Sequence, residues 1–178
     1  MRKIVYVNAE VIGLEILTKS YGLAGTVIKK FQHGEACTHC AGTYFAADGY
    51  RVFEMKMGGL TTTPLKKWID KNLDNIVKIS YPIFADFNTI KFNNIVIKDV
   101  SRGVRYDTGG LLYWAWVKLA FLNDPDSLFC SEQLGQYYRD AGHLICPDLK
   151  PRQQAPINHY KAIGVTQVDY TDNIIKER

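Results

Sequence analysis

The chain lacks a long uninterrupted apolar segment. Its longest candidate, residues 111–122 (LLYWAWVKLAFL), is shorter than the roughly 20 apolar residues that a membrane-spanning helix needs, and it contains Lys118. The N-terminal stretch MRKIVYVNAEVIG has only a short apolar run, broken by Asn8 and Glu10, which is unlike a secretory signal. We therefore expect a cytoplasmic protein with no stable membrane insertion.

Long runs of one charge are also missing. The net charge is +4, but the lysines are scattered in small groups such as Lys29-Lys30 and Lys66-Lys67. Nucleic-acid binding is typical of basic residues gathered into one patch with interleaved aromatic residues. This pattern therefore argues against a nucleic acid as partner.

The composition has no bias towards disorder or a fibrous repeat. Hydrophobic residues make up 47% and charged residues 22% of the 178 positions, which is close to the globular average. A chain of this length can bury one sizeable core. We expect residues 1–178 to form a single domain.

Hydrophobic periodicity and turn residues predict a mixture of strands and helices. Residues 38–46 and 50–56 are β-prone runs joined across Asp48-Gly49, which is a strong hairpin signal. The other expected strands are residues 3–7, 76–81 and 165–170, and the expected helices are residues 23–31, 64–71, 87–100, 107–121 and 127–141. This order predicts an α+β fold in which an antiparallel sheet packs against helices.

Cysteine is scarce, and its four positions suit a reducing compartment better than a disulfide framework. The positions are Cys37, Cys40, Cys130 and Cys146. A helix that begins at Ser127 would place Cys130 in its first turn, on the same face as Leu134 and Tyr138. The thiol is then either an apolar filler or a nucleophile whose thiolate is stabilised by the helix N-terminus.

A nucleophilic thiol needs a base, and the chain has four histidines. His143 follows Cys130 by 13 residues, or roughly 20 Å along one helix, which excludes it. His33 beside Gly34 and His159 in a polar segment are expected to be solvated. His39 begins a strand of the hairpin, which helices should cover, so it is the best candidate.

Several short motifs occur in an order that resembles a known family. They are THCAG, then VFEM followed by a double glycine, then RYD, then FCSEQL leading to an alanine-glycine pair. The set resembles the circularly permuted papain-like cysteine hydrolases, the YiiX-like relatives of the NlpC peptidoglycan peptidases, over roughly residues 10–170. In that family the histidine strand precedes the cysteine helix, which reverses the chain order of papain.

The resemblance implies an activity and a set of residues. Cys130 would be the nucleophile, His39 the general base and Glu54 the third member, with no cofactor. The implied reaction is cleavage of an amide bond through a thioester, by an amidase or peptidase acting on small peptides of the cell-wall type. Acyl transfer, thioester hydrolysis and lipid hydrolysis are alternatives on the same fold, and so is a catalytically silent binding protein.

The third member raises a difficulty of strand register. A two-residue turn at Asp48-Gly49 would set Glu54 opposite Thr43, four residues or about 13 Å from His39, too far for a hydrogen bond. Either the register differs or another group orients His39. The competing interpretation places Glu54 on the solvent face of an edge strand.

A competing hypothesis assigns the cysteines to zinc. Cys37 and Cys40 have the spacing of a metal knuckle, and His143 with Cys146 would complete a four-ligand structural or interaction module. Successive side chains of a strand point to opposite faces, so His39 and Cys40 cannot both coordinate one ion.

Overall fold

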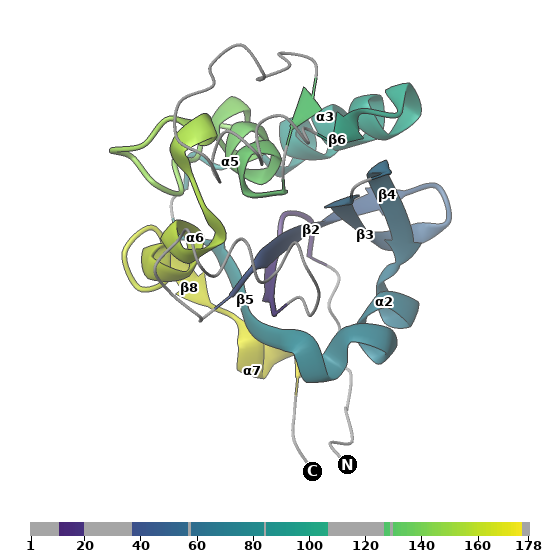
Figure 1. The fold of residues 1–178 in the computed structure, drawn as a ribbon, viewed down its shortest axis with the longest axis horizontal. Helices are drawn as coiled ribbons and strands as arrows, with labels where there is room; N and C mark the ends of the chain where they lie inside the picture. Colours follow the sequence, from purple (N-terminus) through teal and green to yellow (C-terminus); the bar gives the residue numbers. More distant parts are fainter. Residues whose placement is uncertain are drawn as a thin grey trace.

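The computed structural model describes residues 11–19, 37–56, 58–83, 85–106, 127–128 and 130–175. Within these residues the centre of the fold is a six-stranded sheet in the order β4-β3-β2-β1-β5-β8 (Figure 1). Every neighbouring pair in it is antiparallel. Its strands are β1 (Glu15–Thr18), β2 (His39–Ala46), β3 (Gly49–Lys56), β4 (Gly59–Pro64), β5 (Ile76–Pro82) and β8 (Gln167–Asp169). The α+β class predicted from the sequence is confirmed.

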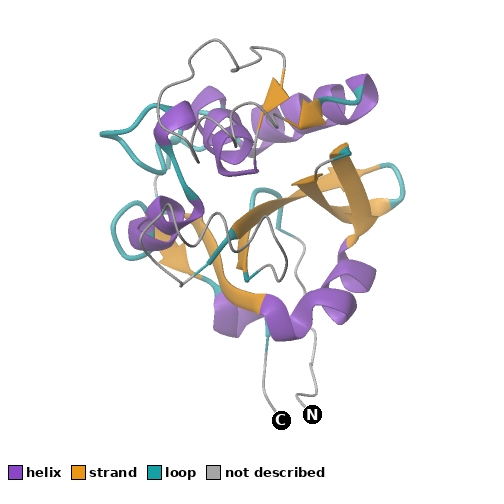
Figure 2. Cartoon of the chain, viewed as in Figure 1, coloured by secondary structure: helices purple, strands orange, loops and turns teal. Residues whose placement is uncertain are grey.

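Helices lie on both sides of this sheet (Figure 2). They are α2 (Leu65–Asn72), α3 (Thr89–Arg102), α5 (Cys130–Asp140), α6 (Pro156–Ala162) and α7 (Thr171–Ile174), with 3-10 turns η1 (Leu73–Asn75) and η3 (Pro151–Gln153). Two short strands, β6 (Arg105–Tyr106) and β7 (Ser127–Leu128), pair in parallel just before α5. None of the helices in the described part of the chain has the length and hydropathy needed to cross a membrane.

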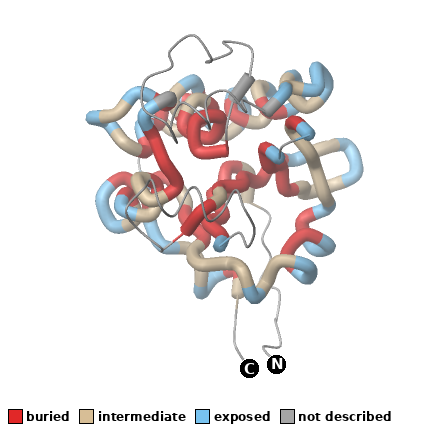
Figure 3. Tube along the Cα trace, viewed as in Figure 1, coloured by how far each residue is buried: buried red, intermediate tan, exposed pale blue. Residues whose placement is uncertain are grey.

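The sheet has a hydrophobic core on each face, because successive side chains of a strand point to opposite sides. Leu17 and Phe53 pack towards α3 and α5, where Tyr138 is fully buried. Their neighbours Ile16 and Val52 belong to the other core, against α2 and α7. In Figure 3 the buried segments accordingly run along the central strands and α5.

The predicted hairpin is confirmed, but its turn is one residue earlier than expected. Ala46 pairs with Gly49, so the two loop residues are Ala47 and Asp48. Gly49 has a φ of 110°, a conformation that glycine adopts without a steric penalty. This turn changes the register of the whole hairpin.

The other elements match the sequence pattern to different degrees. Elements α2, α3 and β5 lie where residues 64–71, 87–100 and 76–81 predicted them, and β8 occupies part of the expected strand 165–170. Strand β1 was not foreseen. The expected elements at residues 3–7, 23–31 and 107–121 lie outside the described residues.

The predicted helix start at Ser127 is wrong. Ser127 and Leu128 pair with Arg105 and Tyr106, so α5 begins only at Cys130 and ends at Asp140. His143 therefore follows the cysteine helix and does not belong to it. Gly142, with a φ of 94°, lies just beyond the helix end, which agrees with the expected end of this helix at residue 141.

Substitution of Gly42 by alanine should destabilise the fold. A Cβ at Gly42 would overlap Cζ of Phe53 and lie 2.9 Å from Cδ1 of Leu134, both inside the core that α5 covers. Such overpacking typically costs about 1–3 kcal/mol. Urea unfolding of the Gly42→Ala protein should show this loss in the free energy of unfolding.

Gly58→Ala is the matched control, since no atom lies within 4 Å of its Cβ position. Its effect should stay within about 0.5 kcal/mol. Equal unfolding midpoints for Gly42→Ala and the wild-type protein would contradict the described packing of β2 against α5.

Candidate active site

Cys130 is the first residue of α5 and is 4% exposed. Leu134 and Tyr138, which were expected on the same helix face, are also buried, so the predicted inward face is confirmed. The thiol lies in the same buried cluster as Cys40, and it interacts with both His39 and Cys40 strongly enough to shift their pKa values. The cysteine thus meets the one histidine that the sequence favoured as its base.

His39 begins β2, where its side chain is 18% exposed. Its Nε2 lies 3.1 Å from Oε2 of Glu54. The imidazole therefore contacts a carboxylate, and it retains access to solvent at the end of the strand.

Glu54 lies close to His39 because of the hairpin register. It pairs with Ala41, two residues along β2 from His39 and on the same side of the strand. The expected pairing with Thr43 is wrong, since Thr43 pairs with Val52. Because the turn is at Ala47 and Asp48, one residue before the predicted position, Glu54 lies close to His39 and not four residues away from it along β2.

The expectation that Glu54 occupies the solvent face of an edge strand is also wrong. Strand β3 lies between β2 and β4, and Glu54 is 6% exposed. Trp68 Nε1 donates to Oε1 at 2.9 Å, and Lys56 Nζ lies 2.6 Å from the same oxygen. These partners occupy one oxygen and leave Oε2 for His39.

Trp68 was not identified from the sequence as a site residue. Its signal was the apolar face of α2, on which Leu65, Trp68 and Ile69 are buried. A buried tryptophan usually finds an acceptor for its indole N–H, and Glu54 is that acceptor here.

The electrostatic shifts follow from these contacts. Burial lowers the pKa of His39, but the charge of Cys130 and hydrogen bonds to Cys130 and Glu54 outweigh it and raise this pKa to about 10. A hydrogen bond from Cys40 and the nearby His39 hold the pKa of Cys130 well below its usual value, against the effect of burial. Burial opposes ionisation of Glu54, yet hydrogen bonds from His39, Lys56 and Trp68 lower its pKa to about 2. The contacts favour an ionised thiolate and imidazolium.

His159 is fully buried, which overturns the expectation of a solvated side chain. Pro156 begins α6, whose inner face carries His159 against the sheet. The ring contacts the equally buried Glu15 of β1, with 2.5 Å between Nδ1 and Oε1. Sequence reasoning missed this pair because β1 itself was not predicted.

The zinc set expected from the sequence is not assembled. The structure places His143 against the rings of Phe87 and Tyr138. Cys37 donates to the carbonyl oxygen of Pro156 at 3.1 Å. In the part of the chain that the structure describes, one group of three metal-ligating side chains lies within 4.8 Å, and it consists of Glu15, Cys40 and His159.

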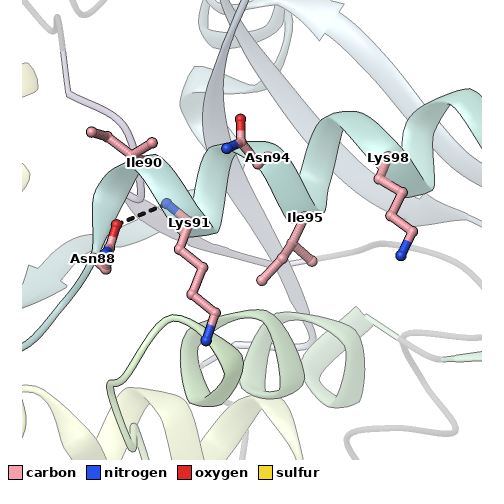
Figure 4. A pocket seen from close by; sticks show the side chains of 6 residues that line it. All are labelled: Asn88, Ile90, Lys91, Asn94, Ile95 and Lys98. Atoms are coloured by element: carbon pink, nitrogen blue, oxygen red, sulfur yellow. Dashed lines mark hydrogen bonds between the residues drawn. The ribbon is translucent and has the colours of Figure 1, made fainter.

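A surface pocket of about 400 Å³ lies along α3, apart from these residues (Figure 4). The side chain of Asn88 caps this helix by accepting from the backbone N–H of Lys91 at 2.8 Å. The lining residues are Asn88, Ile90, Lys91, Asn94, Ile95 and Lys98. This lining contains no thiol, hydroxyl or carboxylate, and the residues considered above lie instead at the junction of α5 with the hairpin.

No protein-family model matches the chain, and no curated protein sequence matches it significantly. The case for a function therefore rests on the geometry around Cys130.

The Glu54 carboxylate should contribute stability that depends on pH. Its pKa falls from 4.5 to about 2 on folding, so its contribution is complete above the unfolded pKa and is lost as the pH falls from about 4.5 towards 2. The free energy of unfolding of Glu54→Gln should be a few kcal/mol below wild type at pH 6, at about 1.4 kcal/mol per pKa unit.

Urea unfolding of both proteins between pH 6 and pH 3 measures this difference, which should narrow as the pH decreases. Asp48→Asn is the control, because the Asp48 carboxylate is 63% exposed where it pairs with Arg51. A difference for Glu54→Gln that is constant across this pH range would contradict the described hydrogen bonds.

Proposed function

We propose that the chain is a cysteine hydrolase of the circularly permuted papain-like type, with an amidase or peptidase activity. The observation that carries the proposal is the 3.1 Å contact of His39 with Glu54, together with the interaction of the same imidazole with Cys130; these residues come from β2, β3 and α5. A thiol, an imidazole and an orienting carboxylate in this order are what nucleophilic catalysis by cysteine requires.

In the proposed reaction the Cys130 sulfur attacks the carbonyl carbon of an amide. The new C–S bond replaces the C–N bond, and the leaving amine takes a proton from the His39 imidazolium. A water then gives a proton to His39 and adds to the thioester carbon. The C–S bond breaks, and the acid product and the original thiolate-imidazolium pair are released.

The position of Cys130 at the start of α5 supports the oxyanion step. The first backbone N–H groups of a helix have no partner within the helix, and the dipole favours negative charge there. The helix has 11 residues, enough for a developed dipole. The N–H of Cys130 is therefore a candidate donor to the tetrahedral intermediate.

Glu54 acts in this scheme as a positioning residue. It holds the His39 ring through Nε2, and the same ring interacts with the thiol of Cys130. Trp68 and Lys56 in turn hold Glu54, which reduces the freedom of the carboxylate to turn away from the ring.

The reaction that we propose is amide hydrolysis, and the proposed substrates are small peptides of the cell-wall type. The order of the histidine strand before the cysteine helix supports it through the resemblance to the permuted family. Acyl transfer or lipid hydrolysis would use the same thioester, and none of the described contacts favours either over the amidase.

Cys130 should be the residue modified by an acylating electrophile. A covalent acyl probe followed by mass mapping should label Cys130 in the wild-type protein, and Cys130→Ala should lose both labelling and hydrolysis. Cys146→Ala is the control, because Cys146 is a half-buried thiol outside the contacts of Cys130. If the Cys130→Ala protein still hydrolysed a peptide substrate, the proposal would be refuted.

Trp68→Phe should lower activity without unfolding the protein. An aromatic ring remains in the core, but the indole N–H that donates to Glu54 is removed. A less firmly held carboxylate should reduce kcat about tenfold, equivalent to about 1.4 kcal/mol, with KM nearly unchanged. Steady-state kinetics with a peptide substrate, together with the melting temperature, measure this effect. A fall in kcat that simply follows a loss of folded protein would show that Trp68 acts only through packing.

A further inference from the structure

A second group that consists of a cysteine, a histidine and a glutamate lies in the interior of the fold, next to the proposed active site. Glu15 comes from β1, Cys40 from β2 and His159 from α6, and their ligating atoms all lie within 4.8 Å of one another. Each of the three residues is at most 1% exposed. The group is therefore closed to a peptide substrate but has the size of a metal site.

The ring of His159 is held with Nδ1 directed at this group. Its Nε2 contacts Oε1 of Gln154 at 2.9 Å, while Nε2 of Gln154 donates to the carbonyl oxygen of Leu149 at 3.2 Å. Gly135 of α5 leaves room for Gln154, since a Cβ there would lie within 2.3 Å of its Oε1. Such a partner on the far ring nitrogen is typical of metal-binding histidines.

The Glu15 carboxylate is held in place by a hydrogen bond to Oε2, the oxygen that does not contact His159. Ser80 Oγ donates to Oε2 at 3.3 Å, which leaves Oε1 facing His159. Among the described residues, the only ion pair of Glu15 is the one with His159. A buried carboxylate beside sulfur atoms is costly unless positive charge compensates it, and a divalent ion would supply that charge.

The three donors differ in kind and together suit zinc. A thiolate, an imidazole and a carboxylate are all ligands of this ion, and a tetrahedral site requires a fourth. Cys130 lies in the same buried cluster as Cys40 and interacts with it, so its sulfur is our candidate for that position.

We propose that Glu15, Cys40 and His159 bind a zinc ion, with the sulfur of Cys130 as the fourth ligand. Binding displaces to solvent the thiol proton of Cys40 and the proton that His159 Nδ1 shares with Glu15 Oε1, and it occupies the lone pair of the Cys130 thiolate that would attack a substrate. The regulatory part of this inference rests on the proposed function: zinc keeps the hydrolase inactive, and its removal releases Cys130.

Zinc binding is tested first, without reference to activity. The full chain, freed of metal by a chelator, should take up one zinc per molecule in equilibrium dialysis. Cobalt(II), used as a spectroscopic probe, should give the absorption of a tetrahedral site and a thiolate-to-cobalt charge-transfer band. A protein that retains no zinc at an equimolar concentration of ion and protein would overturn the site.

Two variants and a control locate the ion. Cys40→Ser should lose about half of the charge-transfer intensity and most of the affinity, because one of two thiolate ligands is removed. Gln154→Ala should weaken zinc binding by about 10- to 100-fold through the freed His159 ring. Cys146→Ser should bind zinc like the wild-type protein, because Cys146 is not in the group. Far-ultraviolet circular dichroism verifies that each variant is folded, and unchanged affinity in both Cys40→Ser and Gln154→Ala would overturn the assignment.

The effect on Cys130 is read separately. Stoichiometric zinc should slow alkylation of Cys130 by iodoacetamide at least tenfold, and a chelator should restore the rate. Zinc bound with no change in this rate would remove Cys130 from the ligand set. A protein that binds zinc as described but hydrolyses no amide after chelation would retain the metal site and refute the proposed function.

Discussion

The register between β2 and β3 is the constraint on which the candidate site depends. Because Ala41 pairs with Glu54, the carboxylate lies on the same side of the hairpin as His39 and within hydrogen-bond distance of it. A shift of one residue would turn Glu54 to the opposite face, away from Trp68 as well. The turn at Ala47 and Asp48 fixes this register, which places Glu54 beside His39.

Cys130 joins two carboxylate-histidine pairs that differ in their access to solvent. The pair of Glu54 and His39 lies at the end of β2, where the imidazole is partly exposed. The pair of Glu15 and His159 is fully buried, next to Cys40. The two pairs therefore differ in exposure, and the interaction of Cys40 with Cys130 connects them. If both proposals hold, the same sulfur is either a nucleophile or a ligand.

Much of the local structure was predictable because its determinants are close in sequence. The hairpin, the helices α2 and α3 and the buried face of α5 follow from alternation, helical spacing and breaker residues. The start of α5 could not be predicted in this way, because it depends on the pairing of Ser127 with Arg105, which are far apart in the chain. Local helix signals cannot reveal that a distant strand competes for the same backbone hydrogen bonds.

The choice of Cys130, His39 and Glu54 came from the sequence, through motif order and the elimination of other histidines. By itself the sequence determined the α+β class, the hairpin and the inward face of the cysteine helix. Only the tertiary structure decided the hairpin register and the burial of His159 against Glu15, two residues separated by 144 positions. Periodicity reports which side of an element is apolar, whereas the partner of a buried charge depends on which distant segments pack together.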